Sequence, residues 1–146
     1  MIKALQQTLA AANRPSYILE TGDGTRLLIL PHGARVLGLF TAGVDENFYW
    51  TNSDLERAAS ATQLFSSPGW QNTGGDRTWI SPELDIFFPG YPDTIRYQVP
   101  PALDSAGYEV LHKPNSMGLR RTVRLYVART YREHEFELLK WIEPAP

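Results

Sequence analysis

The sequence contains no cysteine, and this absence removes several kinds of chemistry at once. Disulfide bonds, thiolate metal ligands and a cysteine nucleophile are all excluded. Long apolar runs are missing too, because no stretch approaches the length that a membrane-spanning helix needs. A large excess of charge of either sign is also lacking, because 14 basic residues nearly balance 16 acidic ones. We therefore expect neither nucleic acid nor a membrane as partner.

Histidine is scarce, and its placement excludes further classes of site. The three histidines, His32, His112 and His134, show no spacing typical of a zinc site. No phosphate-binding glycine loop and no nucleophile elbow occurs in the chain. We therefore expect no metal and no cofactor, and keep only His32, at a predicted turn, as a peripheral site candidate.

The first 13 residues have the pattern of an amphipathic helix. Ile2, Leu5 and Leu9 share one helical face, whereas a signal peptide would carry a continuous apolar run and a cleavage site. Pro15 ends this helix, because it disfavours helical geometry in the residue before it. The chain is therefore expected to be soluble and cytoplasmic.

Length and composition predict one folded domain. A chain of 146 residues with 42% hydrophobic and 12% aromatic residues can bury a substantial core without covalent cross-links. No repeat or linker divides the sequence, so residues 1–146 are taken as a single domain.

Short alternating segments separated by glycine and proline predict an antiparallel β fold. The Gly-Asp-Gly turn within residues 21–24 is a hairpin signal, because glycine adopts positive φ at low cost. Residues 134–142 also permit a helix, but the neighbouring strands favour a strand. The expected strands are 16–20, 25–30, 36–43, 48–51, 94–99, 107–112, 119–128 and 134–142. The fold class is mostly β, an antiparallel β-sandwich with a short N-terminal helix.

Two further sequence patterns predict a second helix and the solvent-exposed face of a strand. Ser53 and Glu56 have capping-box spacing, which predicts a helix over residues 53–64. Five arginines near the C-terminus are interpreted as the solvated face of a strand rather than a nucleic-acid patch, because the overall charge is balanced. They are Arg120, Arg121, Arg124, Arg129 and Arg132.

The segment 66–93 lacks regular periodicity and carries the candidate site residues. Long irregular segments in compact domains are uncommon and are often binding loops. An indole covers the apolar face of a pyranose, while amide, carboxylate and guanidinium groups bond its hydroxyls. The glycine pair 74–75 permits a positive φ or close approach to a ligand. The candidate ligand-binding residues are Trp70, Asn72, Asp76, Arg77, Trp79 and Glu83.

A structural interpretation of the same residues stands beside this one. Trp70 and Trp79 can plug a core. Asp76 with Arg77 can staple the loop, and Glu83 can bridge to Arg77 or to another arginine.

Residues 72–83 also resemble a family pattern. The run Asn-Thr-Gly-Gly-Asp-Arg-Thr-Trp-Ile-Ser-Pro-Glu resembles the Gly-Gly-(His or Asp)-Arg-x-Trp-x-x-Pro-Glu motif of the galactose-mutarotase-like superfamily. Residues 25–40 followed by 47–50 resemble the opening hairpin of those domains. The resemblance implies a β-supersandwich that binds carbohydrate on its concave face. Complete domains are about twice as long as this chain, so it implies the N-terminal part, with a sheet edge that partner strands would cover.

The resemblance supports binding more than catalysis. Related aldose epimerases open the sugar ring with a His general acid and a Glu general base, and that Glu lies later in the domain than residue 146. The His before the paired glycines is also missing here. We assign no catalytic residue, and an epimerase-like isomerase is the activity that the resemblance implies.

The leading function is therefore carbohydrate binding. The alternative is a non-catalytic interaction module that self-associates into a homo-oligomer through an open sheet edge.

Overall fold

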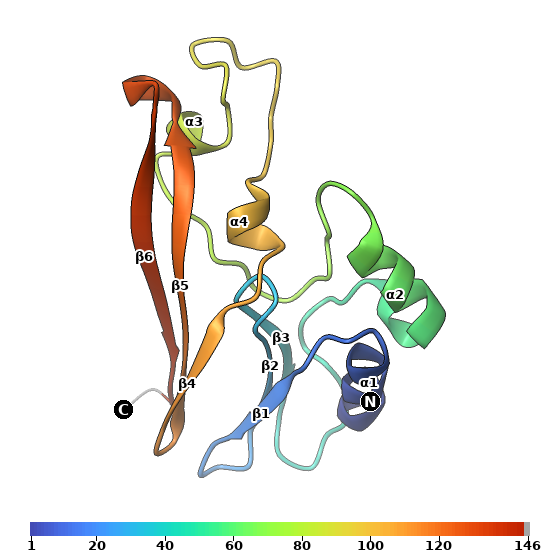
Figure 1. Ribbon diagram of the computed structural model, residues 1–146. Helices are drawn as coiled ribbons and strands as arrows, with labels where there is room; N and C mark the ends of the chain where they lie inside the picture. The colour runs from blue at the N-terminus through green and yellow to red at the C-terminus, as the bar shows by residue number, and fades with distance from the viewer. Residues whose placement is uncertain (145–146) are drawn as a thin grey trace.

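Two antiparallel sheets of three strands each organise the computed structural model, which describes residues 1–144. The first sheet contains β1 (Tyr17–Glu20), β2 (Arg26–Leu30) and β3 (Arg35–Phe40), and the second contains β4 (Glu109–Lys113), β5 (Ser116–Val127) and β6 (Arg132–Ile142). In each sheet the strands are neighbours in chain order (Figure 1). The mostly β, antiparallel character and the short N-terminal helix, α1 (Ile2–Ala11), are confirmed.

The predicted hairpin at residues 21–24 joins β1 to β2. Glu20 lies opposite Arg26 at the end of the ladder next to the turn. Gly24 adopts a φ of +80°, which glycine tolerates because it has no Cβ. The Asp23 carboxylate accepts a hydrogen bond from the Thr25 amide at 3.0 Å, so the turn satisfies its own backbone.

In the first sheet β2 and β3 are buried on both faces over most of their length, which explains their nearly continuous apolar sequences. Leu28 and Leu30 pack against α1 and α2 (Ala58–Ser66), while Ile29 between them packs against the second sheet. Figure 1 shows α1 and α2 on one side of this sheet and β4 to β6 on the other. The predicted apolar face of α1 is confirmed, because Ile2, Leu5 and Leu9 are its buried residues.

The second sheet extends beyond the first and gains its own cover there. Its far half packs against two short helices, α3 (Glu83–Ile86) and α4 (Pro101–Asp104), as Figure 1 shows. The core of this half contains Phe87, Leu103, Val123 and Leu125. The irregular segment predicted for residues 66–93 therefore holds one helical turn and supplies apolar side chains to the sheet.

Two predicted strands are wrong. Residues 48–51 run in irregular structure, where the Phe48 amide donates to the Leu39 carbonyl and Thr51 makes an isolated bridge to Gly74. Residues 94–99 alternate in sequence, yet Ile95 is 88% exposed, and no ladder includes the segment in the described part of the chain. Alternation predicts a strand only where a neighbouring strand supplies the hydrogen bonds.

The helix predicted over residues 53–64 is in the right place but begins differently. A 3₁₀ turn, η1 (Ser53–Glu56), precedes α2, and the extended Arg57 separates them. Its cap is Asn52, whose side chain accepts from the Asp54 amide, so the predicted capping box of Ser53 and Glu56 is wrong. Of the helices within residues 1–144, none is both long and apolar enough to cross a membrane.

Candidate functional site

The glycine pair brings the candidate loop against the first sheet. Gly74 and Gly75 adopt φ values of +90° and +70°. A Cβ on Gly74 would lie 2.3 Å from the Trp50 carbonyl oxygen, and one on Gly75 would lie 2.4 Å from that of Val36. The predicted positive φ is confirmed, and the close approach is to the chain's own backbone.

Asp76 fastens this loop to both sheets. Its Oδ1 accepts from the Val36 amide at 2.5 Å, and its own amide donates to the Val36 carbonyl at 3.0 Å. Its Oδ2 accepts from Lys140 Nζ on β6 at 2.6 Å. Asp76 therefore closes part of the β3 edge and pairs with Lys140, so the predicted staple between Asp76 and Arg77 is wrong.

Arg77 lies against two tryptophans. Its guanidinium carbon is 4.2 Å from the ring centroid of Trp70 and 5.6 Å from that of Trp79. Its Nη2 donates to Asn72 Oδ1 at 2.7 Å, which fixes the plane of the guanidinium. Four of the six predicted site residues thus meet in one place, named here the Arg77 cluster: Trp70, Asn72, Arg77 and Trp79.

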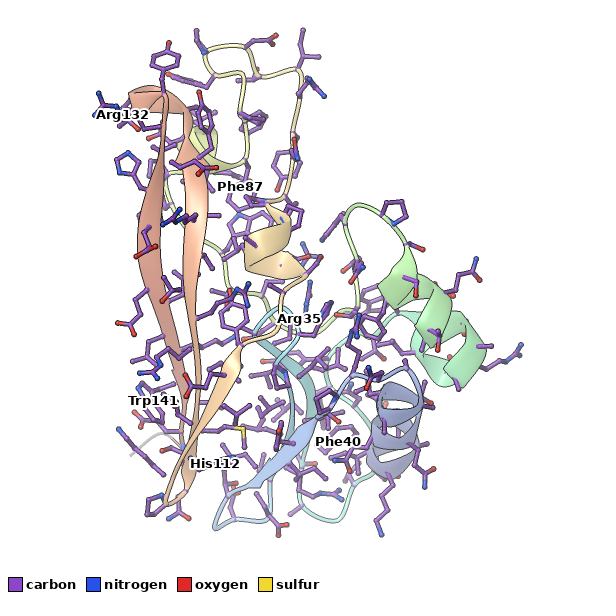
Figure 2. All side chains as sticks on the ribbon, in the orientation of Figure 1. Arg35, Phe40, Phe87, His112, Arg132 and Trp141 are labelled. Atoms are coloured by element: carbon purple, nitrogen blue, oxygen red, sulfur yellow. The ribbon has the colours of Figure 1, made fainter. Side chains whose placement is uncertain are left out.

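The two indoles of the Arg77 cluster differ in how much surface they offer. Trp70 is 54% exposed and Trp79 is 39% exposed, so neither is a plug of the core. One face of Trp79 stacks on Phe87, with ring centroids 4.3 Å apart and an interplanar angle of 18°. Figure 2 shows Phe87 on the segment between α3 and α4, beside the long hairpin. Trp70 therefore offers the freer aromatic surface.

Glu83 lies apart from the Arg77 cluster. It is the first residue of α3, and its Oε1 accepts from the Tyr97 hydroxyl at 3.3 Å. Partial burial, together with the neighbouring Glu83 carboxylate, raises the pKa of Tyr97, so the phenol remains a neutral donor. The predicted bridge from Glu83 to Arg77 is therefore wrong.

A buried ion pair that no sequence pattern predicted holds the loop against β3. Arg35 donates from Nη2 to Asp104 Oδ1 at 2.6 Å and from Nη1 to the Gly74 carbonyl at 2.9 Å. Figure 2 shows Arg35 where β3 approaches α4. Burial lowers the pKa of Arg35 and Asp104 raises it, but a guanidinium keeps its charge at any physiological pH. The partners are 69 residues apart, and no local signal joins them.

His32 anchors the start of the loop. Its Nε2 lies 2.9 Å from Gln71 Oε1, while Gln71 Nε2 donates to the carbonyls of Phe65 and Ser67. Because that amide oxygen is an acceptor, His32 donates from Nε2. Burial lowers the pKa of His32, which favours the neutral ring. The histidine kept as a peripheral candidate thus positions the loop.

The chemistry available at the cluster is that of a binding surface. Its groups are two indoles, an amide and a guanidinium, whereas the two carboxylates of the predicted site, Asp76 and Glu83, are engaged by Lys140 and Tyr97. Within residues 1–144, no group of three or more His, Asp or Glu side chains is placed to hold a metal ion.

A scan against models of protein families, a search of curated proteins and a search of solved structures each return no match for this chain.

Proposed function

We propose that this chain is a carbohydrate-binding domain of the galactose-mutarotase-like type, whose two sheets belong to a β-sandwich. The observation that carries the proposal is the Arg77 cluster: an exposed indole, Trp70, with a guanidinium and an amide fixed beside it. Sugars bind where an aromatic face meets a few convergent polar groups. The resemblance of residues 72–83 to the family motif supports the same ligand class.

The polar groups beside Trp70 are held in position to form hydrogen bonds with the hydroxyls of a sugar. A guanidinium has five N–H donors, and Asn72 takes one of those of Arg77. Stacking against the indoles holds the remaining donors in a fixed plane, so a ligand hydroxyl meets them without a large ordering cost. In this proposal Trp70 stacks on the sugar ring and Arg77 donates to its hydroxyls.

The proposal is limited to binding. Ring opening needs a general acid and a general base whose pKa values are tuned for proton transfer. The Asp76 carboxylate bonds the Val36 amide and pairs with Lys140, a role that holds the loop in place. An isomerase activity of the aldose-epimerase type would depend on groups that the Arg77 cluster does not include.

The experiment is a tryptophan fluorescence titration against neutral, acidic and phosphorylated monosaccharides and short oligosaccharides. A saturable change that is lost in Trp70→Ala and in Arg77→Ala supports the site. The matched control is Trp50→Ala, because Trp50 is 61% exposed and belongs to the segment next to Gly74 but not to the Arg77 cluster. A saturable change that survives Trp70→Ala and disappears in Trp50→Ala would place the ligand elsewhere.

A second candidate function is protein interaction through an open sheet edge. The observation that favours it is β6, an 11-residue strand at the edge of the second sheet. Unpaired edges are templates for strands of other chains. This function and sugar binding use different surfaces, so the titration above does not decide between them.

A further inference from the structure

The outer side of β6 is a long, unoccupied strand edge. β5 pairs with its inner side along the whole strand, from Val127 opposite Arg132 to Met117 opposite Ile142. Within residues 1–144, no backbone hydrogen bond from another segment reaches β6 on its other side. Figure 1 likewise shows no described segment beside that edge.

The edge of β3, by contrast, is closed by side chains and loop backbone. The Asn47 side chain accepts from the Leu39 amide and donates to the Leu37 carbonyl, and Asp76 bonds both backbone groups of Val36. The Phe48 amide donates a hydrogen bond to the Leu39 carbonyl. Folded proteins blunt or cover edges that would otherwise pair with other strands. The open β6 edge differs from this pattern.

One face of β6 is strongly acidic. Glu133, Glu135 and Glu137 alternate along the strand, and all three are exposed. Their one ion-pair partner within the described residues is Arg124 of β5, whose Nε lies 3.2 Å from Glu135. A strand paired with the outer edge of β6 would therefore lie beside three glutamates, of which only Glu135 has an ion-pair partner within the described residues.

The other face of β6 is apolar in its middle, at Phe136 and Leu138, and borders a cavity there, while Arg132, His134 and Lys140 share this face. Phe136 and Leu138 are half-buried and line a cavity of ≈ 270 Å³ together with Ile80, Ile86 and Val127. A strand paired with β6 directs alternate side chains toward the same face as Phe136 and Leu138. Such side chains would extend the apolar surface that these two residues begin.

We propose that the outer edge of β6 binds an extended segment of another protein that alternates basic and apolar side chains. Backbone hydrogen bonds to the open edge supply the affinity, as in other cases of strand addition. The basic side chains face Glu133, Glu135 and Glu137, and the apolar ones face the side of Phe136 and Leu138. This interface is independent of the Arg77 cluster.

The charge pattern argues against a second copy of this chain as the occupant. An antiparallel pair of β6 strands centred on Glu135 or Glu137 places glutamates directly opposite glutamates, which is destabilising. The strand with the complementary pattern is β5, with Arg120 and Arg124 on its exposed face, but β4 and β6 already occupy both of its sides. In this proposal the complementary strand therefore comes from a different protein.

The test uses a fluorescently labelled synthetic peptide with the sequence of residues 119–127, which already pairs with β6 from its inner side. Fluorescence anisotropy measures its binding to the whole chain. The control peptide carries Arg120→Glu and Arg124→Glu and is expected to bind about tenfold more weakly, because like charges replace opposite ones across the strands. Absence of saturable binding by the basic peptide, or equal affinity for both peptides, would overturn the proposal.

A charge-reversed protein gives the reciprocal test. Glu133→Lys together with Glu137→Lys leaves the ion pair of Glu135 intact and is expected to reverse the preference toward the acidic peptide. Sedimentation of the unmodified chain tests self-association. A mass that rises with concentration and falls when the basic peptide is added would make a second copy the occupant and would overturn the proposal in favour of a homo-oligomer.

Discussion

Arg35 and Asp104 form a salt bridge of 2.6 Å with almost no access to solvent, their side chains being 1% and 4% exposed. The pair joins β3 to α4, and Arg35 also holds the Gly74 carbonyl of the candidate loop. The second carboxylate oxygen of Asp104 is buried and has no hydrogen-bond partner among the described residues. The arrangement positions the loop, because the Arg35 guanidinium bonds Asp104 and the Gly74 carbonyl at the same time.

Removing one partner of this pair is expected to destabilise the fold strongly. Asp104→Ala leaves the Arg35 guanidinium buried without a counter-charge, which costs about 3–5 kcal/mol of unfolding free energy. The double variant Arg35→Met with Asp104→Leu should lose less, because no isolated charge remains. Urea unfolding measures both. A single variant that is no less stable than the double variant would contradict this account.

Gly75→Ala is expected to disrupt the loop more than another glycine substitution at positive φ. The matched control is Gly69→Ala, because Gly69 has a φ of +90° and nothing lies within 4 Å of a Cβ built on it. This control substitution should cost about 1–2 kcal/mol of unfolding free energy from backbone strain alone. Gly75→Ala adds a Cβ 2.4 Å from the Val36 carbonyl, which should cost about 1–3 kcal/mol more. Urea unfolding of the two variants gives the comparison, and equal costs would contradict the close approach.

The buried His32 is expected to make the protein less stable as the pH falls. Burial lowers the pKa of His32 in the folded state below its ordinary value of 6.5, so the unfolded chain takes up the proton first. Stability from this group is full above the ordinary pKa and is lost as the pH falls toward the folded-state value. Urea unfolding at several pH values between 8 and 5 measures the loss.

The control for this pH dependence is His32→Gln, which keeps an amide donor near Gln71 and does not titrate. The difference in unfolding free energy between the original chain and this variant should be most favourable to the original chain at pH 8 and should shrink toward pH 5. A difference that stays constant across this range would show that His32 does not titrate with a lowered pKa.

Local sequence patterns predicted the elements whose causes are local. The face of α1, the turn at Gly24 and the alternation of β5 and β6 each depend on residues close in sequence, and the structure confirms them. The segments 48–51 and 94–99 carry strand-like sequences but have no strand ladder. Whether an alternating segment becomes a strand depends on a partner that its own residues do not specify.

In the candidate site, too, sequence patterns predicted only the groupings of residues that are close in sequence. The grouping of tryptophan, arginine and asparagine in one glycine-containing loop predicted the Arg77 cluster, because these residues lie within ten positions of one another. The pairs that hold the loop were not predicted: Lys140 is 64 residues from Asp76, and Arg35 is 69 from Asp104. A carboxylate and a cation so far apart in sequence meet only once the sheets have assembled.

Arg77→Lys is expected to weaken the Arg77 cluster although the charge is kept. Lysine lacks the planar guanidinium that lies against Trp70 and bonds Asn72, so the loss should be about 0.5–1 kcal/mol of unfolding free energy. Tryptophan emission should change at the same time, because the surroundings of two indoles change. The matched control is Arg96→Lys, at an exposed arginine of the segment 94–99, which should alter neither quantity. If Arg77→Lys behaves like this control, the stacked guanidinium does not order the loop, and Trp70 would have to bind a ligand without a fixed donor beside it.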